Sequence, residues 1–156
     1  MKKTLELIEN FFNDLNWKYT YDAENTKIQT GINMTNALGN LDIYIVFRKT
    51  SYSVLVCLNS HVEKKYLQQV SEYLHRVNFG LNNGNFELDY EDGEIRYKTF
   101  VSFENIELSK DIIEESILLP LGMFEKYGMN LLLLMLQKAD PKSLAINADS
   151  QNIVNE

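Results

Sequence analysis

The stretch from Asn85 to Phe103 constrains the fold more than any other part of this chain. Apolar and charged side chains alternate on both sides of the dipeptide Asp92-Gly93. A period of two is typical of strands that bury one face, because successive side chains point to opposite faces of a sheet. Asp-Gly favours the type I′ turn of a tight hairpin. The sequence therefore predicts a β-hairpin with Asp92-Gly93 at its tip.

The position of the turn also predicts the register of the hairpin. Opposite charges that face each other across two strands contribute roughly 0.2–1 kcal/mol per pair, so the charged face should favour this pairing. The predicted pairs are Leu88–Tyr97 and Tyr90–Ile95 on the apolar face, and Glu87–Lys98 and Asp89–Arg96 on the charged face. Glu91–Glu94, beside the turn, is the one unfavourable predicted pair.

Four further strands are indicated upstream of the hairpin. Alternation predicts short strands around residues 17–21 and 28–32. Residues 41–48 and 52–58 are apolar at both odd and even positions. This pattern is typical of strands that are buried on both faces or central in a sheet. We expect these two strands to form the middle of the sheet.

Three helices are predicted from apolar residues at helical spacing. The first covers residues 4–15, with Thr4 as its N-cap, and the second covers residues 62–81. Ser109 should open the third, which Pro120 should kink or split because proline cannot donate a backbone hydrogen bond. Asp140-Pro141 should end it.

The order of these elements predicts the fold class. It reads helix, two strands, two strands, helix, two strands, helix, without the strand–helix–strand alternation of a parallel sheet. We therefore expect an α+β fold in which an antiparallel sheet of five to six strands packs against three helices. Residues 1–140 should form a single domain, and residues 141–156 a peripheral or mobile C-terminal tail.

Charge and composition disfavour several partners and locations. The net charge of −7 does not suit a nucleic acid. The single Cys57 and the lack of signal-peptide features at the N-terminus favour a cytoplasmic protein. The most apolar uncharged run, residues 127–137, is too short to span the ~30 Å of a membrane, so no membrane partner is expected.

The sequence offers no set of residues with a recognisable catalytic or metal-binding spacing. His61 and His75 belong to no ligand motif, and Cys57 lies in an apolar strand, where an inert buried thiol is expected. The acids between Glu87 and Glu94 do not have the spacing of a calcium-binding loop. We therefore expect no catalytic residues, no metal and no cofactor, and a protein that is not an enzyme.

An excess of apolar residues late in the chain leaves two interpretations open. Leu131 to Leu136 cannot all face one sheet from a single helix. They either frame the core from a bent segment or form a dimer interface or a groove for a partner's helix or extended peptide. The candidate partner or dimer surface comprises Met123, Phe124, Tyr127, Leu131, Leu132 and Met135.

A small-molecule sensor is the alternative function. Its ligand would lie in a pocket between the sheet and the helices, lined by Trp17, Tyr44 and Tyr66.

Four short stretches carry a resemblance to a known family. They are Asn78-Phe79-Gly80, residues 84–89, residues 92–97 and Phe124-Glu125-Lys126-Tyr127. Here the chain resembles the YbjN-type domain, a bacterial family labelled a sensory transduction regulator. The resemblance implies an α+β fold like that of type III secretion chaperones, in a small, acidic, often dimeric protein that binds a polypeptide without catalysis. It carries no catalytic residues. We expect a bacterial regulatory or chaperone-like protein-binding domain that forms a homodimer and has a polypeptide partner.

Overall fold

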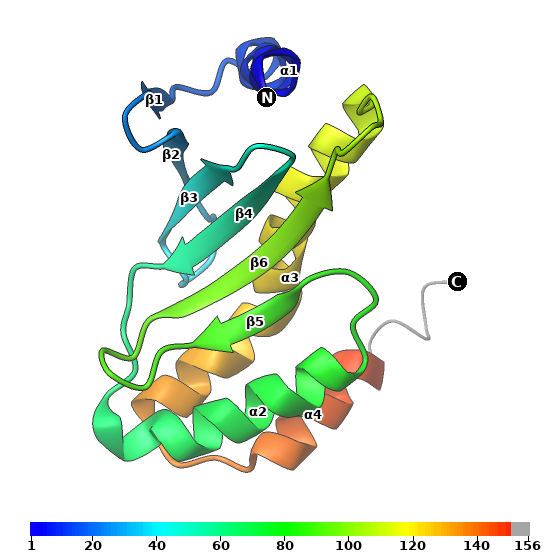
Figure 1. The fold of residues 1–156 in the computed structure, drawn as a ribbon. Helices are drawn as coiled ribbons and strands as arrows, with labels where there is room; N and C mark the ends of the chain where they lie inside the picture. Colours follow the sequence, from blue (N-terminus) through cyan, green and yellow to red (C-terminus); the bar gives the residue numbers. More distant parts are fainter. Residues whose placement is uncertain (151–156) are drawn as a thin grey trace.

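Residues 1–150, the part of the chain that the computed structural model describes, form one six-stranded antiparallel sheet and four α-helices (Figure 1). The predicted α+β class is confirmed. The spatial order of the strands is β1-β2-β3-β4-β6-β5, which places β3 and β4 in the middle, as predicted. The strands are β1 Thr20–Asp22, β2 Lys27–Asn33, β3 Asn40–Phe47, β4 Ser51–Leu58, β5 Asn85–Leu88 and β6 Ile95–Ser102.

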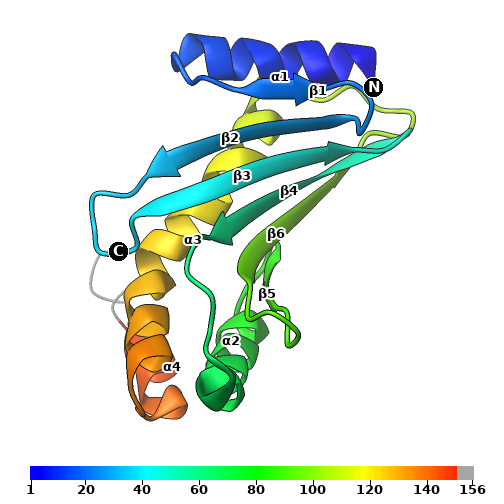
Figure 2. The same ribbon diagram turned by 90° about the vertical axis from the view of Figure 1, so that its left-hand side faces the viewer.

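The longest helix lies across one face of the sheet, and two others lie at its ends (Figure 2). This long helix, α3, contacts β4 and β6. Helix α1 lies beyond β2, whereas α2 lies beside β5 at the opposite end (Figures 1 and 2). The helices are α1 Lys2–Asp14, α2 Leu67–Phe79 after the 3₁₀ turn η1 Lys64–Tyr66, α3 Lys110–Leu136 and α4 Pro141–Ser150.

Helix α4 was not predicted, because its sequence is short and rich in small and polar residues. It forms within the expected tail. Asp140 accepts hydrogen bonds from Ser143, and Pro141 occupies the first helical position, where its missing N–H costs nothing. Ala145 and Ala148 are buried, and α4 contacts α2 and α3. The rest of the predicted tail, residues 151–156, lies outside the described residues.

The core lies between the sheet and α3. Odd-numbered residues of β3 and even-numbered residues of β4 are buried on this face. Residues of the opposite parity are mostly half-buried, so the two central strands bury one face fully. Helix α1 adds Ile8, Phe11 and Phe12 to the core. It begins at Lys2 with Met1 as N-cap, and Thr4 is buried within it, so the predicted N-cap is wrong.

The hairpin has the predicted faces but a different register. Phe86 faces Tyr97 and Leu88 faces Ile95, a shift of two residues from the prediction. A shift by two keeps every side chain on its face, because the side-chain period of a strand is two. The turn is correspondingly longer and spans residues 89–94. All five predicted cross-strand pairs are therefore wrong: Leu88–Tyr97, Tyr90–Ile95, Glu87–Lys98, Asp89–Arg96 and Glu91–Glu94. Glu87 and Lys98 still form an ion pair, although they do not lie directly opposite each other.

A contact with the chain before η1 accounts for the longer turn. The Val62 amide donates to the Gly93 carbonyl oxygen at 2.9 Å. A Cβ atom on Gly93 would lie 2.3 Å from the Val62 carbonyl oxygen, and the backbone there has φ of +81°. Glycine is thus required by both the left-handed conformation and the close approach. Gly93 serves this docking contact rather than a two-residue turn.

Pro120 does not split α3, which runs as one helix from Lys110 to Leu136. Proline lacks the N–H that would bond the carbonyl of residue 116, four positions earlier. In this fold the Thr99 hydroxyl of β6 donates to that Ser116 carbonyl oxygen at 2.8 Å. The Ser116 hydroxyl lies 2.8 Å from the Tyr52 hydroxyl. The helix continues through Pro120 because the sheet supplies the missing donor.

Helix α3 is also long enough and apolar enough to cross a membrane, judged by length and composition alone. The apolar segment is therefore longer than the run recognised in the sequence. Core helices share these properties, and eleven residues of α3 are buried, including Ile113, Leu121 and Leu134. Helix α3 contacts the sheet, α1, α2 and α4.

Candidate functional site: the open face of the sheet

The predicted partner surface on α3 is largely part of the core. Helix α3 has neighbours on several sides, so its apolar residues are buried on more than one face. The prediction is wrong for four residues that are at most 6% exposed, namely Phe124, Tyr127, Leu131 and Met135. Met123 and Leu132 are half-buried against the core. Met123 also lines a groove of ≈490 Å³ between α3 and the loop after α2.

The three aromatic residues of the alternative ligand pocket lie in separate regions. Trp17 stacks on Phe12 at 5.9 Å between ring centroids. Tyr66 donates to the Leu136 carbonyl oxygen at 3.1 Å. Tyr44 lies in β3 on the face of the sheet away from α3. They therefore do not line one shared pocket.

The face of the sheet opposite α3 is not covered by a helix of the described fold (Figure 1). Figure 1 shows α3 behind β4 and β6, with no helix of residues 1–150 in front of these strands. We call this surface the open face. The register places on it three cross-strand rows: Lys27–Val46–Ser53–Phe100, Gln29–Tyr44–Leu55–Lys98 and Gly31–Asp42–Cys57–Arg96–Glu87.

The centre of the open face is apolar. Tyr44 and Leu55 face each other across β3 and β4, and both are half-buried. Val46 lies next to Tyr44 on the same strand face. Phe100 on β6 is diagonal to Leu55, is separated from Val46 by Ser53, and is 59% exposed. The outward face of an antiparallel sheet is usually polar when it meets only water. The apolar strip of Tyr44, Val46, Leu55 and Phe100 is therefore the feature of this face that requires explanation.

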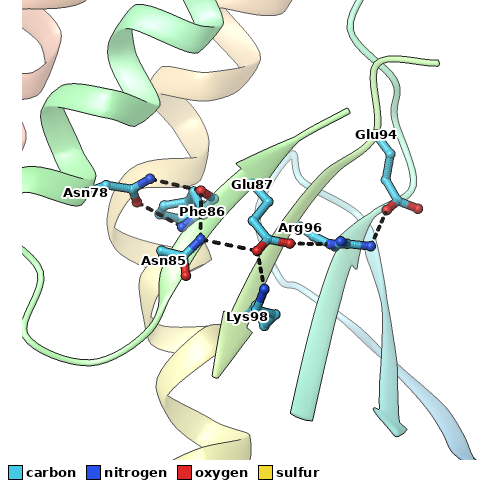
Figure 3. Close-up of polar contacts among 7 residues, drawn as sticks. All are labelled: Asn78, Asn85, Phe86, Glu87, Glu94, Arg96 and Lys98. Atoms are coloured by element: carbon cyan, nitrogen blue, oxygen red, sulfur yellow. Dashed lines mark hydrogen bonds and ion pairs between the residues drawn. The ribbon is translucent and has the colours of Figure 1, made fainter. Parts of the chain in front are cut away.

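An ion-pair cluster flanks the strip on β5 and β6 (Figure 3). Glu87 accepts from the Arg96 Nε at 2.7 Å and is also paired with the Lys98 ammonium. Arg96 reaches Glu94 at 3.6 Å. Partial burial raises the pKa of Glu87, but hydrogen bonds from Lys98 and Arg96 outweigh it and leave this pKa below its ordinary value. The carboxylate of Glu87 is thus neutralised within the chain.

The adjoining sheet edge is closed by a side chain of α2. Asn78 accepts from the Phe86 amide at 2.8 Å and donates to the Phe86 carbonyl oxygen at 2.9 Å (Figure 3). These bonds occupy the backbone amide and carbonyl of Phe86 on the edge strand β5, which would otherwise be free to pair with another strand. Asn78, part of the sequence resemblance, therefore has a structural role.

Asp42 is the carboxylate of the open face that lacks a counter-charge. It is half-buried, and its side chain makes no hydrogen bond or ion pair with any described residue. Beside it lies a hollow of ≈300 Å³, also lined by Gly31, Thr20 and Gln29. A Cβ atom on Gly31 would lie 3.5 Å from the Asp42 Oδ1 atom, so the missing side chain of Gly31 leaves this carboxylate accessible.

Cys57, His61 and His75, the potentially reactive residues considered in the sequence, do not form a common site. Burial raises the pKa of the Cys57 thiol to about 12, and Glu94 adds to the effect. His61 Nδ1 lies 2.9 Å from the Asp92 carbonyl oxygen, and His75 is exposed on α2. Residues 1–148, whose side chains the structure describes, contain no group of three or more potential metal ligands.

The open face could have been anticipated in part from the sequence. In β3 and β4, apolar residues occur at both odd and even positions. Since α3 covers only one face of the sheet, some of these apolar residues must lie on the other face. Nothing local marks Asp42 and Gly31 as neighbours, because they meet through the pairing of β2 with β3.

Comparison with known proteins shows the fold alone. No protein-family model matches the chain, and no curated protein matches it. Among solved structures, the chain is similar to YbjN from E. coli, which is described as a proposed transcription regulator. The similarity covers 94% of this chain and 93% of that one, with a TM-score of 0.51 and 9% sequence identity. The α+β fold suggested by the resemblance is thus shared with YbjN.

Proposed function

We propose that this chain is a non-enzymatic protein-binding module, regulatory or chaperone-like, and that the open face binds a polypeptide. The apolar strip of Tyr44, Val46, Leu55 and Phe100 is the observation that carries this proposal. Contiguous exposed apolar patches commonly mark interaction sites, and aromatic residues are enriched in such interfaces.

A polypeptide suits this surface better than a small molecule does. Ligand pockets are concave and enclose most of the ligand surface. The strip instead lies on a sheet face, where a partner can approach along the strands. Trp17, Tyr44 and Tyr66 are too dispersed to form the alternative pocket.

The chemistry of the face also favours binding over catalysis. A thiol whose pKa is raised to about 12 is a poor nucleophile at neutral pH. Among the charged groups around this thiol, Glu94 and Arg96 are held in an ion-pair cluster, and Asp42 lies opposite Cys57 on β3. A regulator that acts through protein contacts is compatible with the description of YbjN, whose fold this chain shares.

Site-specific photocrosslinking in the native cell would test the proposal. A photoreactive phenylalanine analogue is placed at Phe100, on the open face, or at Ile106, which is similarly exposed in the loop before α3. We expect a discrete protein adduct from position 100 and none from position 106. Equal adducts at both positions, or none at position 100 with the protein folded, would refute the open face as the binding surface.

A further inference from the structure

We propose that the segment bound by the open face is basic as well as apolar, and that one of its Lys or Arg side chains enters the hollow over Gly31 to pair with Asp42. This inference rests on the proposed function and adds the chemistry of the partner. Neighbouring apolar side chains of the same segment would cover Tyr44 and Val46.

Charge complementarity is the first argument. The other carboxylates beside the apolar strip have cations nearby: Glu87 has Arg96 and Lys98, and Glu94 has Arg96. Asp42 has no such partner among the described residues. The chain as a whole carries a net charge of −7, which favours a cationic partner during encounter.

The shape of the hollow is the second argument. Gly31 and Asp42 face each other across β2 and β3, and both side-chain positions lie on the open face. Because Gly31 has no side chain, the hollow of ≈300 Å³ opens directly beside the carboxylate. Lys18 also lines its rim but makes no ion pair with Asp42 in the described chain. The hollow therefore has one carboxylate and one ammonium in its lining, and the carboxylate is accessible and without an ion-pair partner among the described residues.

The spacing along β3 is the third argument. Asp42, Tyr44 and Val46 alternate onto the same face, so neighbouring members lie roughly 7 Å apart. An extended segment with one basic residue followed by apolar residues at alternate positions would match all three. A half-buried carboxylate also attracts a cation more strongly than an exposed one, because water screens the pair less.

The test uses two fluorescein-labelled peptides of defined sequence. In one, Lys alternates with Tyr and Leu, and in the other, Glu replaces each Lys. Fluorescence anisotropy measures binding to the full chain at 0.15 M salt. We expect the Lys peptide to bind and the Glu peptide to bind at least about tenfold more weakly, since like charges at an interface are repulsive.

Three variants locate the effect. Asp42→Asn should weaken the Lys peptide about tenfold, whereas Glu125→Gln, an equal charge change at an exposed position of α3, should change its affinity less than about twofold. Gly31→Leu fills the hollow without changing the charge and should weaken binding as Asp42→Asn does, provided that the sheet accommodates a Cβ atom 3.1 Å from the Leu41 carbonyl oxygen. Circular dichroism checks that each variant is folded.

The possible outcomes separate this inference from the proposed function. Equal binding of the Lys and Glu peptides, or equal effects of Asp42→Asn and Glu125→Gln, would overturn the basic-partner inference. If Tyr44→Thr still weakened binding, or if position 100 still crosslinked, the protein-binding proposal would stand. A dimer that buries the open face, detected by sedimentation and lost in Phe100→Lys, would replace the proposed occupant by a second copy of the chain. Loss of both crosslinking and peptide binding would refute both proposals.

Discussion

The hydrogen bond from the Thr99 hydroxyl on β6 to the Ser116 carbonyl oxygen of α3 gives the most specific stability prediction. Replacing Thr99 by Val keeps the shape of the side chain but removes the donor to the Ser116 carbonyl oxygen, and Pro120 cannot replace it. Thr99 and Ser116 are 1% and 4% exposed, so water has little access to the carbonyl. Leaving a buried polar group unsatisfied costs about 1–3 kcal/mol. For a chain of this size the melting temperature should fall by about 2–12 °C.

A double-mutant cycle with Pro120→Ala tests the cause. Alanine restores an N–H that can bond the Ser116 carbonyl within the helix, so Thr99→Val should then cost less than about 1 kcal/mol. Urea denaturation followed by circular dichroism at 222 nm gives the four unfolding free energies. Equal costs of Thr99→Val in both backgrounds, within about 0.5 kcal/mol, would refute the idea that this hydroxyl compensates for the proline.

Three further predictions concern the hairpin and its neighbour β4. Gly93→Ala should lower the free energy of unfolding, measured by urea denaturation, by more than about 2 kcal/mol, because Gly93 has a positive φ and lies against the Val62 carbonyl. Gly122→Ala, with open space around it, should raise the free energy of unfolding by about 0.5–1 kcal/mol. A mild effect of Gly93→Ala would contradict this. Because the pKa of Glu87 is lowered in the folded state, its ionised carboxylate stabilises the fold at pH values above the unfolded-state pKa of about 4.5. This stabilisation is lost as the pH falls through the pKa of Glu87 in the folded state. The stability difference between wild type and Glu87→Gln should therefore be large at pH 7 and vanish at strongly acidic pH; a constant difference across this range would argue against the ion pairs as its source. The Cys57 thiol should react with a disulfide reagent at pH 8 at least about 100-fold more slowly than in the urea-unfolded chain, and similar rates would exclude its burial.

The faces of the hairpin could be predicted from the sequence, whereas its register could not. The period of two fixes which side chains share a face, and Phe86, Ile95 and Tyr97 are buried as expected. The register depends on the turn, and the turn is lengthened by the contact between Gly93 and Val62, thirty-one positions earlier. A non-local contact thus overrode a local turn preference.

The continuity of α3 through Pro120 was not predicted from the sequence for a similar reason. The rule that proline interrupts a helix is local, but the donor that satisfies the freed carbonyl comes from Thr99 on β6. The four buried residues of the predicted partner surface belong to the core because α3 has neighbours on several sides, which its own sequence cannot specify. The candidate site depends on the same kind of information, since Gly31 and Asp42 become neighbours only through strand pairing.

Hydroxyl-radical footprinting in a native cell extract, compared with the purified protein, is the most direct test of the open face as a binding surface. Tyr44 and Phe100 report on that face, and the exposed side chains of Phe79 and Met129 report on α2 and α3. We predict that oxidation of Tyr44 and Phe100 falls severalfold in the extract while that of Phe79 and Met129 stays unchanged. Protection of Met129 or Phe79 with no protection of Phe100 would contradict the account and place the partner on the helices.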